Sequence, residues 1–112
     1  MDEQLFLTVA DAQLARIETA LERLIDENEA DIDVELKAGG VVEIECANGS
    51  KIIINRHSAA REIWIAARSG GYHFAFDGSA WMAAKDGSEL MSVLARCLSE
   101  QTGTAIDFSR PD

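Results

Sequence analysis

The sequence is poor in several residue types, and each shortage argues against a class of protein or a kind of site. It contains one proline, two cysteines and ten lysines and arginines among 112 residues. No apolar run approaches the roughly 20 residues that a membrane-spanning helix needs, and the N-terminal Met-Asp-Glu-Gln lacks the basic region of a secretory signal. Cys46 and Cys97 form no C-x-x-C motif and fall on apolar faces of predicted elements. We therefore expect a cytoplasmic protein with reduced core thiols rather than a disulfide or a cysteine metal site.

Cations are outnumbered two to one. Twenty aspartates and glutamates face the ten lysines and arginines, so the net charge is −10. Nucleic acids and anionic membranes are polyanions, and this charge argues against both as partners. It favours metal cations or a basic protein surface. The hydrophobic share of 47% is typical of a globular protein, and the length predicts a single domain over residues 1–112.

The negative charge is concentrated in one segment, residues 18–35. Eight carboxylates lie there against one cation, Arg23, so this segment alone carries −7. Folding has to hold these like charges close together, which is unfavourable. Two explanations fit: a solvated face that keeps the protein soluble, or a surface that meets a cation or a cationic partner. The one-sided arrangement of the acids across two elements favours the second.

Hydrophobic periodicity predicts a helix, a run of strands and a second helix. Apolar residues recur in steps of three and four through about residues 4–28, as on one face of a helix. Alternation and short turns then predict antiparallel strands at about 31–37, 42–46, 51–56, 62–68, 72–77 and 81–83. The second helix follows, with Asp86 or Ser88 as its N-cap and Gly103 as its C-terminal stop. We predict an α+β fold, a two-layer sandwich in which N- and C-terminal helices cover one face of a five- to six-stranded antiparallel sheet.

The acids are arranged by these elements. Helical geometry places Glu18, Glu22 and Asp26 in one stripe, which Glu29 joins if the helix reaches that far. Alternation puts the acids of residues 31–35 on one face of the next strand. If helix and strand pack side by side, the two sets merge into one anionic ridge. Carboxylate oxygens suit hard cations such as Fe³⁺, Mg²⁺ and Ca²⁺, with Fe²⁺ and Mn²⁺ also open. An open set of single carboxylates predicts loose binding, as in a carrier or sensor.

The uncovered face of the sheet is a second candidate surface. Trp64 alternates out of phase with its apolar neighbours and should point to solvent, and His73 and Asn55 share its face by the same rule. A tryptophan on an open sheet is a candidate hot spot for protein binding. His57 is placed in the loop after the third strand. The sequence has no nucleophile motif and no phosphate-binding glycine loop, so we expect a protein without enzymatic activity.

Three blocks of the sequence together resemble the bacterial frataxin (CyaY) family. They read Asn-Gly-Ser-Lys-Ile-Ile-Ile-Asn-Arg at 48–56, Ile-Trp-Ile-Ala at 63–66 and Gly-Gly-Tyr-His-Phe at 70–74. The likeness extends over roughly residues 5–108 in the same order and spacing. It implies the frataxin fold, a sheet backed by two helices.

The resemblance also implies a function. Members of this family bind ferrous and ferric iron weakly through acids of the first helix and first strand. They also bind the cysteine desulfurase of the iron–sulfur assembly machinery and regulate cluster formation. The matching iron-binding positions are Glu18, Glu22, Asp26, Glu27, Glu29, Asp31 and Asp33. The matching positions for binding the desulfurase and scaffold machinery are Glu18, Glu22, Asp26, Asn55, Arg56 and Trp64.

The chain departs from the family pattern at three acids. Glu62 stands just before Ile63-Trp64, where many relatives carry glutamine, and Glu43 and Glu45 replace residues that are often uncharged. Both changes add negative charge to the sheet. Two other functions stay open at this point: an acidic docking module whose iron binding is incidental, and weak ferroxidase or iron-storage activity. We expect a monomer, and an iron-dependent oligomer is left open.

Overall fold

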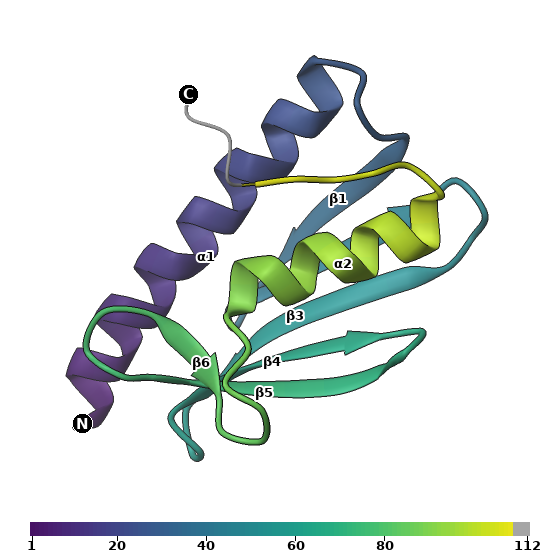
Figure 1. Ribbon diagram of the computed structural model, residues 1–112. Helices are drawn as coiled ribbons and strands as arrows, with labels where there is room; N and C mark the ends of the chain where they lie inside the picture. The colour runs from purple at the N-terminus through teal and green to yellow at the C-terminus, as the bar shows by residue number, and fades with distance from the viewer. Residues whose placement is uncertain (109–112) are drawn as a thin grey trace.

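The computed structural model describes residues 1–108, which form one sheet and two helices. The elements are α1 (Glu3–Asp26), β1 (Ile32–Lys37), β2 (Val41–Cys46), β3 (Lys51–His57), β4 (Glu62–Ala67), β5 (Gly70–Phe76), β6 (Trp81–Ala83) and α2 (Leu90–Thr102). Each strand pairs antiparallel with the next, so β1 and β6 are the edges of a six-stranded sheet. Both helices lie on the same face of it (Figure 1). The predicted two-layer α+β fold is confirmed.

One hydrophobic core fills the space between the helices and the sheet. Both layers supply its largest fully buried side chains, which are Phe6, Phe74, Ile17, Leu21, Ile44, Ile52, Ile54, Ile63, Ile65, Leu90, Leu94 and Leu98. Cys46 and Cys97 are buried in it as free thiols, as expected, and burial raises the pKa of the Cys97 thiol. Ile106 is buried as well, so the chain after α2 packs back onto the core. Neither helix of the described chain is both long enough and apolar enough to cross a membrane.

The helix ends differ from the predicted ones for local reasons. Asn28 takes the left-handed conformation with a φ of 55°, and the Glu29 N–H donates to the Leu24 carbonyl at 2.9 Å. The first helix therefore ends at Asp26, and Glu29 does not continue its acidic stripe.

The start of α2 was also wrongly predicted. The N-cap is Glu89, whose carboxylate accepts from the Met91 N–H at 2.9 Å and the Ser92 N–H at 3.2 Å. Asp86 instead accepts from the Ser88 N–H in the turn before the helix. The predicted stop is confirmed, because Gly103 ends the helix with a φ of 74°.

Successive side chains of a strand point to opposite faces of the sheet, so every second strand residue lies on the face that the helices leave open. In the observed register, the pairs that share the open face include Asp33–Glu45, Glu35–Glu43, Asn55–Trp64, His57–Glu62 and Trp64–His73. The open face is therefore acidic over β1 and β2 and aromatic over β3 to β5.

Two lysines offset the repulsion at the acidic end of the open face. Lys37 Nζ lies 2.6 Å from one Glu43 carboxylate oxygen, and Lys51 Nζ lies 2.9 Å from the other. Hydrogen bonding from Lys37, and then from Lys51, holds the pKa of Glu43 below its ordinary value. The same contacts with Glu43 raise the pKa of Lys37 and of Lys51. Like charges directly opposite each other destabilise a strand pair, so β1 and β2 depend on this bridge.

Glu43→Gln should lower the melting temperature at pH 7, because the amide cannot carry the charge that both lysines meet. A carboxylate whose pKa is lowered by folding stabilises the native state above its unfolded pKa, and this contribution is lost as the pH falls through the lowered value. The gap in melting temperature between wild type and variant should therefore be widest at neutral pH and close in acid. Thermal melts between pH 3 and pH 8 measure it.

Glu45→Gln is the matched control, since Glu45 lies on the same strand and face, between Asp33 on β1 and Lys51 on β3. Its repulsion from Asp33 and its attraction to Lys51 oppose each other, so this variant should lower the melting temperature by less than Glu43→Gln does. A difference in melting temperature between wild type and Glu43→Gln that stays constant from pH 3 to pH 8 would contradict the stabilising role of these ion pairs.

Candidate functional site

The acids of α1 form an exposed stripe near the C-terminal end of the helix. Glu22 and Asp26 are exposed and Glu18 is half-buried. Neighbours in this set are four residues apart, so their like charges repel, and negative charge is also unfavourable at a helix C-terminus. Arg23 offsets part of this, since its Nε lies 3.3 Å from the Glu27 carboxylate. The carboxylates of the stripe therefore repel one another, and they are accessible to cations from solvent.

The acids of β1 lie on a different surface. Ile32 and Val34 face the core, so Asp33 and Glu35 point to the open face of the sheet, away from α1. Asp31 is exposed just before the strand. The expected single ridge is therefore two acidic surfaces, one on α1 and one on the edge strand β1, which the chain joins through residues 27–31 (Figure 1).

These acids do not form a closed metal cage. Within residues 1–108, no group of three or more His, Cys, Asp or Glu side chains is close enough to hold a single ion. A shallow hollow of about 230 Å³ on the open face is lined by Asp33, Glu35, Glu43 and Glu45. Both carboxylate oxygens of Glu43 already form ion pairs with lysines. The donors are hard oxygen ligands that suit iron or other hard cations. They can offer each ion one or two carboxylates, and water has to complete its coordination.

At the other end of the open face, Trp64 lies between two histidines. Its indole ring is stacked on His57, with centroids 3.9 Å apart and planes 13° apart, and on His73, at 4.2 Å and 11°. The indole Nε1–H donates to Glu62 Oε1 at 2.8 Å. Asn55 is the cross-strand neighbour of Trp64. The prediction that Trp64, His73 and Asn55 share a face is confirmed.

Arg56, which the resemblance groups with Asn55 and Trp64 for partner binding, does not share their face of the sheet. It pairs with the buried Ile63 in the register, so it points to the helix-covered side of the sheet. Its guanidinium forms an ion pair with Asp11 of α1. Its side chain crosses Gly40 so closely that a Cβ there would lie 2.6 Å from it. Arg56 therefore ties β3 to α1.

The place of His57 was wrongly predicted, and the contact between Glu62 and the indole was not predicted from the sequence. His57 is the last residue of β3 rather than part of a loop, and its Nδ1 accepts from the Ala60 N–H at 3.3 Å. Extending the alternation by one step beyond Asn55 would have placed it beside Trp64. Glu62 lies two residues before Trp64 and so on its face, which is the spacing that brings the carboxylate to the indole.

Comparison with known proteins agrees with this architecture. A family model described as "Frataxin-like domain" matches residues 1–104. The "Iron-sulfur cluster assembly protein CyaY" of Dechloromonas aromatica is 52% identical over 106 residues, which is 95% of this chain and 97% of that protein. The protein of the same name from Cupriavidus taiwanensis is 44% identical, over 96% of each.

Solved structures show the same fold. A frataxin from Psychromonas ingrahamii superposes with a TM-score of 0.80 at 25% identity, over 98% of this chain and 100% of that one. Trimeric frataxin from the yeast Saccharomyces cerevisiae, complexed with ferrous iron, gives a TM-score of 0.72 at 26% identity, over 85% of this chain and 86% of that one. On the family model and the identities together, this chain belongs to the frataxin family and is a relative of the bacterial CyaY proteins.

Proposed function

We propose that this chain binds iron weakly and works in iron–sulfur cluster assembly through the cysteine desulfurase. The observation that carries the proposal is the exposed acid set of α1 and β1 in a member of the frataxin family. Relatives with up to 52% identity are named for cluster assembly, and a yeast frataxin is complexed with ferrous iron.

Iron is held as cargo rather than as a resident cofactor. The proposed ligands are Glu18, Glu22, Asp26, Glu27, Glu29, Asp31 and Asp33. Because these side chains are spread over two surfaces and no three of them surround a single point, each Fe²⁺ or Fe³⁺ ion keeps most of its water. Such an ion exchanges readily, which suits a protein that supplies or senses iron.

Partner binding uses the same acids and the open face. Glu18, Glu22 and Asp26 meet a basic patch of the desulfurase, where opposite charges speed encounter and fix orientation. Trp64 and Asn55 meet further assembly machinery on the open sheet face. Arg56 acts only indirectly, because its side chain is held against α1.

Neutralising two acids of α1 should weaken iron binding. In the double variant Glu18→Gln, Glu22→Gln, the affinity for Fe²⁺ should fall about three- to tenfold, because each lost charge removes attraction and a ligand oxygen. Anaerobic calorimetry with Fe²⁺ measures the affinity, and sedimentation velocity on the same samples shows whether iron drives a monomer to oligomerise.

The matched control is Glu3→Gln, Glu100→Gln, which changes the net charge equally at two exposed acids outside the set. It should lower the affinity by less than about twofold, since screening weakens distant charges. Equal losses in the two double variants would show that only net charge matters and would contradict the iron site.

Reversing the charge at Glu18 and Glu22 to lysine should reduce binding to the cysteine desulfurase about tenfold or more, because opposed charges become like charges at the interface. Surface plasmon resonance measures it, with Glu3→Lys, Glu100→Lys as control. A docking module with incidental iron binding would lose desulfurase binding too. It would, however, regulate cluster formation equally with and without added iron, and that result would contradict the iron part of the proposal.

We propose no catalytic activity for this chain. The ferroxidase alternative requires Fe²⁺ oxidation faster than in a matched carboxylate buffer, followed by absorbance and oxygen uptake. We expect equal rates, because open carboxylates give the protein little control over the metal. A faster rate that is lost in the double variant Glu18→Gln, Glu22→Gln would overturn this expectation.

A further inference from the structure

The edge of the sheet beyond β5 is only partly covered. β6 pairs with residues 74–76 of β5, while residues 70–73 have no strand beside them on that side in the described part of the chain. The chain turns away after β6, because the Ala83 N–H donates to the Ser88 carbonyl at 2.8 Å. We call the outer side of residues 70–73 the free edge of β5.

Gly71 and His73 supply the backbone groups that point outward along the free edge. Successive residues of β5 direct their N–H and C=O groups alternately to β4 and to the β6 side. The Asp77 N–H donates to the Ala80 carbonyl at 3.0 Å, so the residues in step with Asp77, which are Ala75, His73 and Gly71, face the β6 side. Within residues 1–108, neither a strand nor a loop forms a backbone hydrogen bond with Gly71 or His73 on that side.

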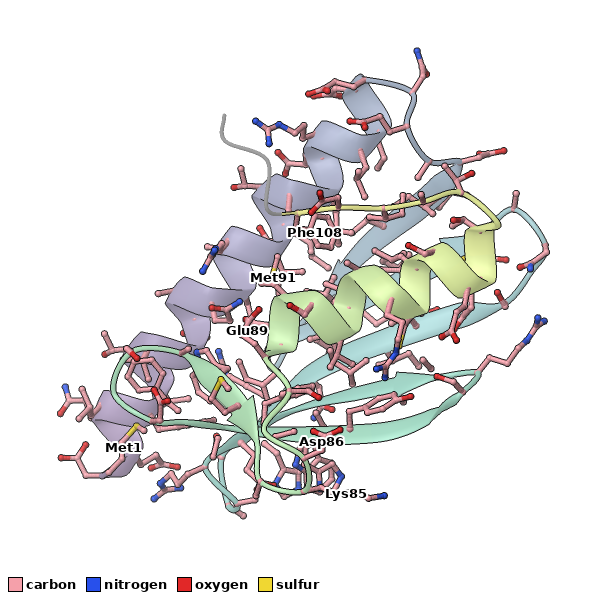
Figure 2. The ribbon with its side chains drawn as sticks, in the orientation of Figure 1. Met1, Lys85, Asp86, Glu89, Met91 and Phe108 are labelled. Carbon is pink, nitrogen blue, oxygen red and sulfur yellow. The ribbon has the colours of Figure 1, made fainter. Side chains whose placement is uncertain are left out.

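A surface hollow of about 380 Å³ lies along the free edge. Gly71, Tyr72 and His73 line one side of it, and the chain that leaves β6 lines the other. Lys85 and Asp86 project there from the loop between β6 and α2 (Figure 2). A Cβ on Gly71 would meet no atom within 4 Å, and the volume is within the roughly 300–1,000 Å³ of ligand pockets. The outward backbone groups therefore face a space that another molecule can enter.

A second copy of this chain does not fit the free edge. In an antiparallel pair that joins Gly71 of each copy to His73 of the other, Phe74 of one copy lies opposite Gly70 of the other. The place beside Phe74 is already taken by Ala83 of the copy's own β6. A separate extended segment brings no such strand, so it can lie along the edge in line with β6. This favours a segment of another protein as the occupant.

We infer that the free edge of β5 binds an extended segment of another protein, which joins the sheet as a short strand in line with β6. Such strand addition is a recurring mode of peptide recognition, in which main-chain hydrogen bonds supply affinity. The segment runs antiparallel to β5, as β6 does. Its residues opposite His73 and Gly71 each exchange an N–H and a C=O with β5. This inference goes beyond the proposed function, because it requires neither iron nor the face that carries Trp64.

The surroundings of the free edge select the side chains of the segment. The residue opposite Tyr72 points to the helix-covered side, since Tyr72 pairs with the buried Ile65 and packs against the core. An apolar side chain suits this position. Of the charged side chains that line the hollow, Glu62 and Asp86 are acidic and Lys85 is basic, and the whole chain carries −10. The segment therefore combines a central apolar residue with basic residues at its ends.

The probe is the synthetic peptide acetyl-Lys-Thr-Ile-Thr-Lys-amide, titrated into the whole chain labelled with ¹⁵N. Its β-branched central residues favour an extended backbone. With the isoleucine opposite Tyr72, the two threonines lie opposite His73 and Gly71. The amide signals of Gly71 and His73 should move downfield and saturate, because their N–H groups gain acceptors. Tyr72 should shift less, since its N–H already faces β4.

Two methylated peptides of the same charge are the controls. N-methylation of both threonines removes the donors that face β5 and should weaken binding at least about fivefold, because two hydrogen bonds are lost. N-methylation of the isoleucine changes an N–H that points away from β5 and should alter the affinity by less than about twofold.

Gly71→Pro tests the same contact from the protein side. It removes an N–H that points away from β4, and proline is tolerated at such edge positions, so the affinity should fall about threefold or more. Gly71→Ala keeps the N–H and adds a methyl group in open space, so it should bind within about twofold of wild type. Thermal melts show whether each variant folds. If Gly71→Pro does not fold, the methylated peptides decide alone.

Three results would overturn the inference: no saturating shift in β5, shifts centred on the acids of α1 or on Trp64, or equal binding of all three peptides, which charge alone would explain. Self-association of the chain through residues 70–73, detected by sedimentation velocity without peptide, would overturn the choice of occupant. None of these results bears on the affinity for Fe²⁺ or for the desulfurase. The proposed function therefore stands or fails on its own tests.

Discussion

The whole arrangement depends on covering one face of a pleated sheet with two helices. Burying a side chain such as Ile44 or Ile54 stabilises the fold by about 1.5–3 kcal/mol, and both lie fully buried against the helices. A register slip of one residue would expose every such side chain of a strand. The same alternation along each strand places the side chains of Asp33, Glu43 and Trp64 on the open face of the sheet. The position of both candidate surfaces is thus fixed by the packing of the core behind them.

Charge is then distributed on this frame in two ways. On the open face, Lys37 and Lys51 both pair with Glu43, so part of the negative charge is used to hold β1 and β2 to their neighbours. On α1, the like charges of Glu18 and Glu22 lie on the helix surface with solvent access. Acids that serve the fold and acids that can serve a ligand are therefore separable, although both come from the same excess of carboxylates.

Much of this could be predicted from the sequence, because period-two and helical patterns report which side chains are buried. The strand order, the buried cysteines and the shared face of Trp64 and His73 follow from these patterns alone. The ion pair of Arg56 could not be predicted, because its partner Asp11 lies 45 residues earlier and no local pattern links the two. Glu29 was wrongly placed on the helix, because the left-handed conformation of Asn28 ends the helix early. The stacking of His57 on Trp64 could not be predicted, because it depends on how neighbouring strands pair.

We propose that iron is held loosely by acids on two neighbouring surfaces, not in one cage. The most direct measurement is an anaerobic Fe²⁺ titration followed by backbone amide NMR, in which the paramagnetic ion broadens nearby signals. We expect the amide signals of residues 18–33 to broaden gradually, with fast exchange and no effect on the amides around Trp64. A single tight site in slow exchange, or signals of residues 18–33 that stay unchanged, would contradict it.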